Sequence, residues 1–186
     1  MNYPFILKFS SITNLSDARY AVCAWADYVG FCFEPSKQEY IEPIKAKEIA
    51  GWINGSLIVG EFGHQPIEWI KDFVAEIPCG AIQVPANYKD TQILDFNLPI
   101  ILEFTNEMTN DVMEINNLIK AFICYNIDTA KVLNQKYNLP VLVELSNYNH
   151  LIQYNHQIGI SLKGEFETIP GTRNHDKWNN LLEDFN

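Results

Sequence analysis

The stretch LKFSSITNLSDARYAVCAWADYVGFCFEP, residues 7–35, decides the expected fold. It starts with an apolar run, continues through a segment with helical spacing and returns to a second apolar run. Asn14 and Ser16 are candidate N-caps for the helical part, and Asp17 lies in the first turn, where a negative charge is favourable. The stretch therefore predicts a strand, a helix and a second strand in that order.

Short apolar runs recur along the rest of the chain and extend this pattern. Most of them lack polar–apolar alternation, which is typical of parallel strands buried on both faces. With helices between them, the runs predict an α/β fold, a compact (β/α)8 TIM barrel, with residues 1–186 as a single domain. A doubly wound open sheet is the alternative. The eight expected strands are Phe5–Ser10, Tyr28–Phe33, Leu57–Phe62, Ala81–Pro85, Pro99–Phe104, Ala121–Tyr125, Pro140–Leu145 and Ile158–Leu162.

The helices between these strands have signals of their own. Pro43 and Gly51 bracket one helix, because proline is favoured at a helix start and glycine at its end, and Pro66 starts another. Apolar residues at helical spacing in the segment 175–185 predict an amphipathic helix that packs on the barrel. Only residues 86–98 separate the fourth and fifth strands, so we expect an abbreviated fourth helix.

The cysteines and tryptophans are expected to be structural. The four cysteines have no CxxC spacing and no Cys/His cluster suggests zinc, so they are predicted to be free, mostly buried thiols, with no metal or cofactor. The tryptophans fall on helical patterns and are predicted to pack in the core: Trp25, Trp52, Trp69 and Trp178.

Composition limits the possible partners and the compartment. The 186 residues are 47% hydrophobic, enough for one well-filled core. A net charge of -10 without a basic stripe argues against a nucleic-acid partner. We expect no membrane partner and no signal peptide, because no apolar run is long enough to span a bilayer and the N-terminus lacks a basic region. The expected protein is cytoplasmic, and either a monomer or a homodimer.

A colinear set of short motifs runs through nearly the whole chain: Lys8, Ile12-Thr13-Asn14, Asp17-Ala18, Gly30-Phe31-Cys32-Phe33-Glu34-Pro35, Val59-Gly60-Glu61-Phe62, Ala81-Ile82-Gln83-Val84, Gly164 and the segment 170–177. This set resembles the phosphoribosylanthranilate isomerase family of tryptophan biosynthesis. The resemblance implies the same barrel and an Amadori rearrangement, in which an aminoaldose becomes an aminoketose. It also implies a small-molecule ligand at the C-terminal face of the barrel.

The resemblance further implies which positions carry the chemistry. In the family a Cys on the first strand is the general base, an Asp at the end of the sixth strand is the general acid, and an Arg after the second strand holds the anthranilate carboxylate. Here Ser10 stands at the first position, Tyr125 or Asn126 at the second, and Glu39 at the third. A serine hydroxyl needs a helper base to take a proton from carbon, and Glu39 would repel a carboxylate. Isomerase activity is therefore expected to be altered or lost.

The phosphate site implied by the resemblance also differs. The family cradles its phosphate in two glycine-rich turns, after the seventh and eighth strands. This chain has Leu145-Ser146 in the first turn and Lys163-Gly164 in the second. Gln83 is retained on the fourth strand, but Pro85 stands where the family has His. The candidate substrate-binding residues are Glu39, Gln83, Lys163 and Gly164.

Three expected strand ends place a glutamate inside an apolar run: Glu61, Glu103 and Glu144. Alternate strands of such a barrel contribute side chains to one interior layer, so these glutamates and Lys8 are candidates for a catalytic layer at the mouth. Unmatched negative charge there predicts a protonated glutamate of raised pKa, a bound cation or a cationic ligand. The alternative is that the glutamates point outward or lie at the rim, paired with Lys or Arg.

Three functions remain open. The first is an isomerase-family enzyme with altered or lost activity. The second is a catalytically inert barrel that binds a small molecule or a partner protein. The third is an active isomerase that uses the substituted residues. The first requires Glu61, Glu103 or Glu144 to converge on a pocket with Ser10 and Lys8.

Overall fold

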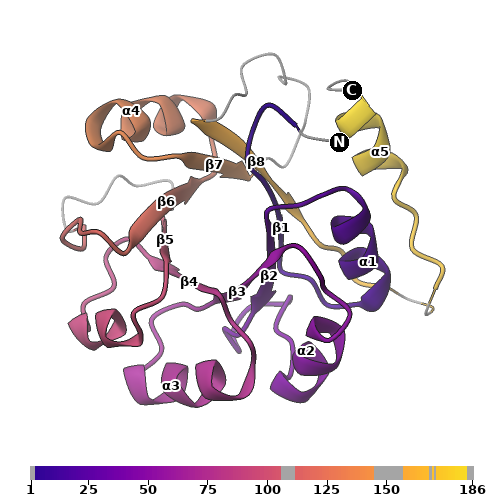
Figure 1. Cartoon of the computed structure of the whole chain (residues 1–186), viewed down its shortest axis with the longest axis horizontal. Coiled ribbons are helices and arrows are strands. Elements are labelled where there is room, and N and C mark those ends of the chain that lie inside the picture. Colours follow the sequence, from indigo (N-terminus) through magenta and orange to yellow (C-terminus); the bar gives the residue numbers. More distant parts are fainter. Residues whose placement is uncertain (1–2, 106–111, 145–156, 168, 170, 184–186) are drawn as a thin grey trace.

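The computed structural model describes residues 3–105, 112–144, 157–167, 169 and 171–183. Eight parallel strands form a closed barrel in chain order, and β8 pairs with β1 (Figure 1). This closure confirms the (β/α)8 barrel and excludes the open doubly wound sheet. The strands are Leu7–Ser10 (β1), Tyr28–Cys32 (β2), Leu57–Glu61 (β3), Ala81–Pro85 (β4), Ile100–Glu103 (β5), Ile119–Cys124 (β6), Val141–Glu144 (β7) and Ile158–Lys163 (β8).

Helices surround the barrel on its outside, as Figure 1 shows. Asn14 is the N-cap of the first, because its side chain accepts a hydrogen bond from the Asp17 N–H, whereas Ser16 lies inside the helix. The abbreviated fourth helix is the 3-10 helix η1, Thr91–Phe96. The α-helices are Leu15–Cys23 (α1), Pro43–Ala50 (α2), Ile67–Glu76 (α3), Ile127–Tyr137 (α4) and Asp176–Glu183 (α5).

The barrel interior changes from apolar to polar along the strands. An apolar cluster inside the barrel contains Val59, Ala81, Ile101, Ala121, Ile123 and Leu142. Successive side chains of a strand alternate between its faces, so residues two apart share a face. Glu61, Gln83, Glu103 and Glu144 each follow a member of this cluster by two residues. The polar side chains therefore form the next interior layer, towards the C-terminal ends of the strands.

The prediction that all the tryptophans pack in the core is wrong for two of them. Trp25 and Trp52 are 66% and 61% exposed, whereas Trp178 is 2% exposed and its ring centroid lies 4.8 Å from that of Phe9. The reason is position: Trp25 and Trp52 come just after the last turns of α1 and α2 and not within a buried helix face.

The cysteines are free thiols: Cys32 and Cys124 are buried, Cys79 is half-buried and Cys23 is exposed. Burial raises the pKa of the Cys32 and Cys124 thiols to about 11, so they are protonated at neutral pH. None of the helices in the described ranges has the length and apolar character needed to cross a membrane.

Candidate active site at the barrel mouth

An ion pair lies buried inside the barrel between β1 and β3. The Lys8 Nζ lies 2.5 Å from Glu61 Oε1 and donates to Gln83 Oε1 at 2.6 Å. The other Glu61 oxygen accepts hydrogen bonds from the N–H and the hydroxyl of Ser11, at 3.0 and 2.9 Å. Gly30 leaves the space for this carboxylate, because a Cβ there would lie 1.9 Å from Glu61 Oε1. The Glu61 carboxylate is thus held from both sides.

Gln83 extends this network to the opposite wall. Its Nε2 donates to Glu103 Oε2 at 3.0 Å, and the Tyr125 hydroxyl donates to Glu103 Oε1. The Lys37 Nζ approaches the same Glu103 oxygen at 3.9 Å. Burial and the neighbouring Glu103 charge raise the pKa of Tyr125 strongly, so its hydroxyl keeps its proton at neutral pH.

A second group of hydrogen-bonded side chains, Ser10, Glu144 and Ser161, links β1, β7 and β8. The Ser10 hydroxyl donates to Glu144 Oε2, and the Ser161 hydroxyl donates to the same oxygen at 3.2 Å. The strand register pairs Glu144 with Ser161 and Ser161 with Lys8, so these three residues lie at one level of the barrel. Burial raises the pKa of the Glu144 carboxyl, although the Lys8 charge and the Ser10 hydrogen bond oppose this shift.

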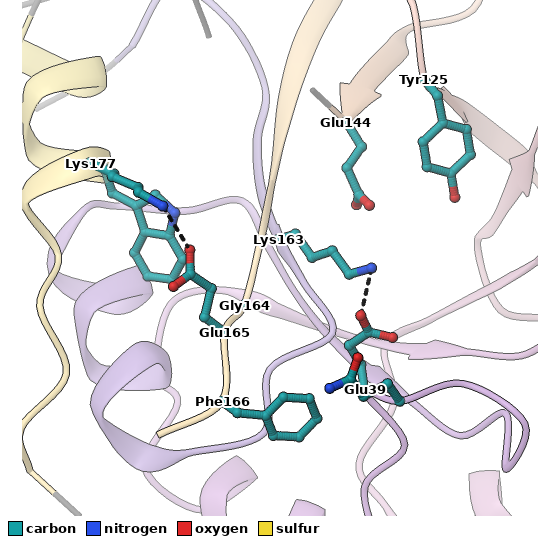
Figure 2. A pocket seen from close by; sticks show the side chains of 10 residues that line it. Glu39, Tyr125, Glu144, Lys163, Gly164, Glu165, Phe166 and Lys177 are labelled. Carbon is teal, nitrogen blue, oxygen red and sulfur yellow. Dashed lines mark ion pairs between the residues drawn. The ribbon is translucent and has the colours of Figure 1, made fainter. Parts of the chain in front are cut away.

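A cavity of about 520 Å³ opens above this second group. Glu144 and Tyr125 point from their strand ends towards a pair formed by Lys163 Nζ and Glu39 Oε1, 2.7 Å apart (Figure 2). Although burial opposes both shifts, this pairing lowers the pKa of Glu39 and raises that of Lys163. The cavity is lined by Gln38, Glu39, Tyr125, Glu144, Lys163, Gly164, Glu165, Phe166, Lys177 and Trp178.

The sequence-predicted site residues divide between the cavity wall and the barrel interior. Tyr125, Glu144, Glu39, Lys163 and Gly164 line the cavity, whereas Ser10 reaches it only through its bond to Glu144. The Lys8–Glu61 ion pair and Gln83 lie inside the barrel and do not line the cavity. The glutamates point inward, which excludes the outward orientation.

Of the two alternatives at the end of β6, Tyr125 faces the cavity. The Asn126 side chain accepts from the Thr129 N–H and caps α4, so it is engaged outside the site. Leu145 and Ser146, expected at the first phosphate turn, lie outside the described residues.

Sequence reasoning missed several residues of the site. Ser161 lies two residues before Lys163 on β8, so strand alternation would have placed both on the interior face. Ser11 has no such signal, because it adopts a left-handed backbone with φ 53° directly after β1. Gly30 is visible in the sequence, but only the position of Glu61 explains why a side chain does not fit there.

The loop after β8 directs its backbone donors at internal acceptors. The Gly164 N–H donates to the Ser10 carbonyl at 2.8 Å, and the Glu165 N–H donates to Asp17 Oδ2 at 3.1 Å. Asp17 is fully buried and also accepts from Arg173 Nε at 3.0 Å and contacts His175 Nε2 at 2.9 Å. The buried Asp17 carboxylate therefore anchors the loop after β8 to α1.

Metal binding has no support in the described ranges, where no group of three or more His, Cys, Asp or Glu side chains is placed to hold an ion. The carboxylates of the barrel mouth are instead partnered by lysines, hydroxyls and an amide. Proton transfer by side chains is the chemistry that this arrangement supports.

Known proteins resemble this chain both in sequence and in fold. N-(5'-phosphoribosyl)anthranilate isomerase of Neisseria gonorrhoeae is 30% identical over 106 residues, 56% of this chain and 51% of that protein. The same enzyme of Thermotoga petrophila is 35% identical over 79 residues, 42% of this chain and 38% of that protein. The matched region thus spans about half or less of these relatives' own length.

The fold comparison covers almost the whole chain. The crystal structure of phosphoribosyl anthranilate isomerase from Thermus thermophilus superposes with a TM-score of 0.74 and 20% identity over 96% of this chain and 97% of that one. No protein-family model matches the sequence. The chain is thus similar to phosphoribosylanthranilate isomerases in local sequence over about half or less of their length, and it shares their barrel fold.

Proposed function

We propose that this chain is an isomerase-family barrel whose mouth has been rebuilt for proton transfer by Glu144, and that ordinary phosphoribosylanthranilate isomerisation is altered or lost. The observation that carries the proposal is the hydrogen bond from Ser10 to Glu144 at the cavity wall. The resemblance to the isomerase family implies that Ser10 occupies the position of the family's catalytic Cys. The carboxylate that it contacts supplies the base that a serine lacks.

Glu144 has the environment of a general base. Its raised pKa brings the carboxyl closer to neutral, which favours proton transfer at physiological pH. Ser10 and Ser161 both donate to Oε2, so they orient the carboxylate and leave Oε1 for a ligand in the cavity. Tyr125 lies on the same cavity, and since it donates its proton to Glu103, its oxygen is a candidate acceptor for a ligand hydroxyl.

The altered substrate position supports the loss of the ordinary reaction. The resemblance implies that Glu39 occupies the position of the Arg that holds the anthranilate carboxylate in the family. In this structure Glu39 pairs with Lys163 at 2.7 Å. This pair presents a neutralised surface in place of a free guanidinium. An anthranilate carboxylate would have to displace Glu39 from Lys163 to gain a cation there.

A second candidate is a catalytically inert barrel, and one observation favours it. Among the described residues, Thr13 Oγ1 is the only buried side-chain polar atom without a hydrogen-bond partner. The interior network of Lys8, Glu61, Gln83 and Glu103 is thus satisfied internally, as in a structural core. An active isomerase that uses Ser10 and Tyr125 in place of the usual pair is the third candidate.

Hydrogen exchange at carbon separates these candidates. The purified protein is incubated in D2O with five- and six-carbon aldoses, ketoses and their amino derivatives, and deuterium next to the carbonyl is followed by NMR. We expect protein-dependent exchange that falls about 10²–10⁴-fold in Glu144→Gln. Glu68→Gln, on the exposed side of α3, is the matched control.

Exchange that is equal in Glu144→Gln and the unchanged protein would contradict the role of Glu144. Absence of exchange with every sugar would favour the inert barrel. Turnover of phosphoribosylanthranilate, measured on the same preparation, would favour the substituted isomerase.

A further inference from the structure

The charges of the cavity wall are paired except at one carboxylate. Lys163 pairs with Glu39 at 2.7 Å, and Lys177 approaches Glu165 at 3.7 Å (Figure 2). Within the described residues, the direct partners of Glu144 are the hydroxyls of Ser10 and Ser161. The wall therefore holds one carboxylate that lacks a direct cationic partner in the described part of the chain.

An anionic ligand finds little support in the same loop. Gly164 and Glu165 direct their N–H groups at the Ser10 carbonyl and the Asp17 carboxylate. The N–H groups of Gly171 and Arg173 both donate to Glu167 Oε1, at 2.8 and 3.2 Å. The backbone N–H groups after β8 that could bind a phosphate thus already donate to oxygen atoms of the protein itself.

Given the proposed function, we infer that the mouth takes a small polyhydroxylated amine without a phosphate group, whose ammonium pairs with Glu144. The cavity of about 520 Å³ has the size of small-molecule sites. Gln38, Tyr125 and the Lys163–Glu39 pair offer donors and acceptors for hydroxyl groups. The ammonium also favours the ionised form of Glu144, which is the form that a base requires.

The test compares three soluble probes by isothermal titration calorimetry: glucamine (1-amino-1-deoxysorbitol), sorbitol and ribose 5-phosphate. We expect glucamine to bind at least about tenfold more tightly than either other probe, because a charge-assisted hydrogen bond to a partly buried carboxylate is gained. Glu144→Gln should remove this advantage of glucamine over sorbitol.

Lys163→Met should change the affinity for glucamine in the opposite direction to Glu144→Gln. It leaves Glu39 without its cation, so it should strengthen glucamine binding and weaken any binding of ribose 5-phosphate. This variant keeps the proposal testable if Glu144→Gln does not fold. Glu68→Gln should change none of the three affinities.

Tighter binding of ribose 5-phosphate than of glucamine would overturn the inference, and so would binding of none of the probes. The binding result is separate from the deuterium-exchange result. Glucamine binding through Glu144 without carbon exchange supports the inference and contradicts the proposed function. Glu144-dependent exchange together with tighter binding of ribose 5-phosphate supports the proposed function and contradicts the inference.

Discussion

The hydroxyl of Ser10, at the end of β1, donates a hydrogen bond to the carboxylate of Glu144, at the end of β7. The intervening strand β8 contributes Ser161, which donates to the same oxygen. Closure of the barrel thus brings the first strand and the last two strands together at one carboxylate of the cavity wall. The chemistry proposed for this barrel depends on that carboxylate.

The raised pKa of Glu144 predicts a pH-dependent stability difference. Since the folded protein holds this proton more tightly than the unfolded chain, its contribution to stability falls as pH rises from the ordinary value of 4.5 through the raised value. Glu144→Gln removes this loss. The variant should gain stability relative to the unchanged protein between acidic and neutral pH, as measured by urea unfolding at several pH values.

A relative stability of Glu144→Gln that is constant with pH would contradict the raised pKa. The control is Glu68→Gln, because the Glu68 side chain is 76% exposed. Its stability relative to the unchanged protein should depend little on pH.

The buried ion pair predicts strong coupling between its members. Lys8→Met leaves Glu61 as a buried carboxylate without its cation and should cost about 3–5 kcal/mol of unfolding free energy. The double variant Lys8→Met/Glu61→Gln should cost less than the sum of its single variants, because no charge remains unpaired. Urea unfolding of the three variants measures this coupling energy. Additive losses would show that the two side chains do not stabilise each other.

The contact between Gly30 and Glu61 predicts that Gly30→Ala disturbs the site. The added methyl would overlap Glu61 Oε1, and Glu61 is held by Lys8 and Ser11, so the variant should lose about 1–3 kcal/mol. Gly51→Ala is the matched control, because its backbone φ of -61° suits alanine and its Cβ would lie 3.4 Å from the Glu48 carbonyl oxygen, an acceptable contact. Thermal unfolding of both variants is the measurement. Equal melting temperatures would contradict the packing argument.

Local patterns were sufficient to predict the barrel and the inward glutamates. The apolar runs marked all eight strands, and the two-residue period put Glu61, Glu103 and Glu144 on one face. The choice between Tyr125 and Asn126 required the structure, because adjacent residues at a strand end differ only in which one caps α4.

Long-range pairs were beyond the sequence patterns. Nothing near Glu39 indicates that Lys163 neutralises it, since the two residues meet only when the barrel closes. The burial of Asp17 against Arg173 likewise depends on how the loop after β8 returns to α1. Trp25 and Trp52 were misassigned because the helical pattern does not reveal where a helix ends.

Complementation tests the central claim most directly, namely that the rebuilt mouth does not support ordinary isomerisation. The chain is expressed in a bacterium that lacks phosphoribosylanthranilate isomerase, on medium without tryptophan, with the Neisseria gonorrhoeae relative as positive control. We predict no growth although soluble, folded protein is present. Growth that depends on this chain and is lost in Ser10→Ala would contradict the claim and identify an isomerase that uses substituted residues.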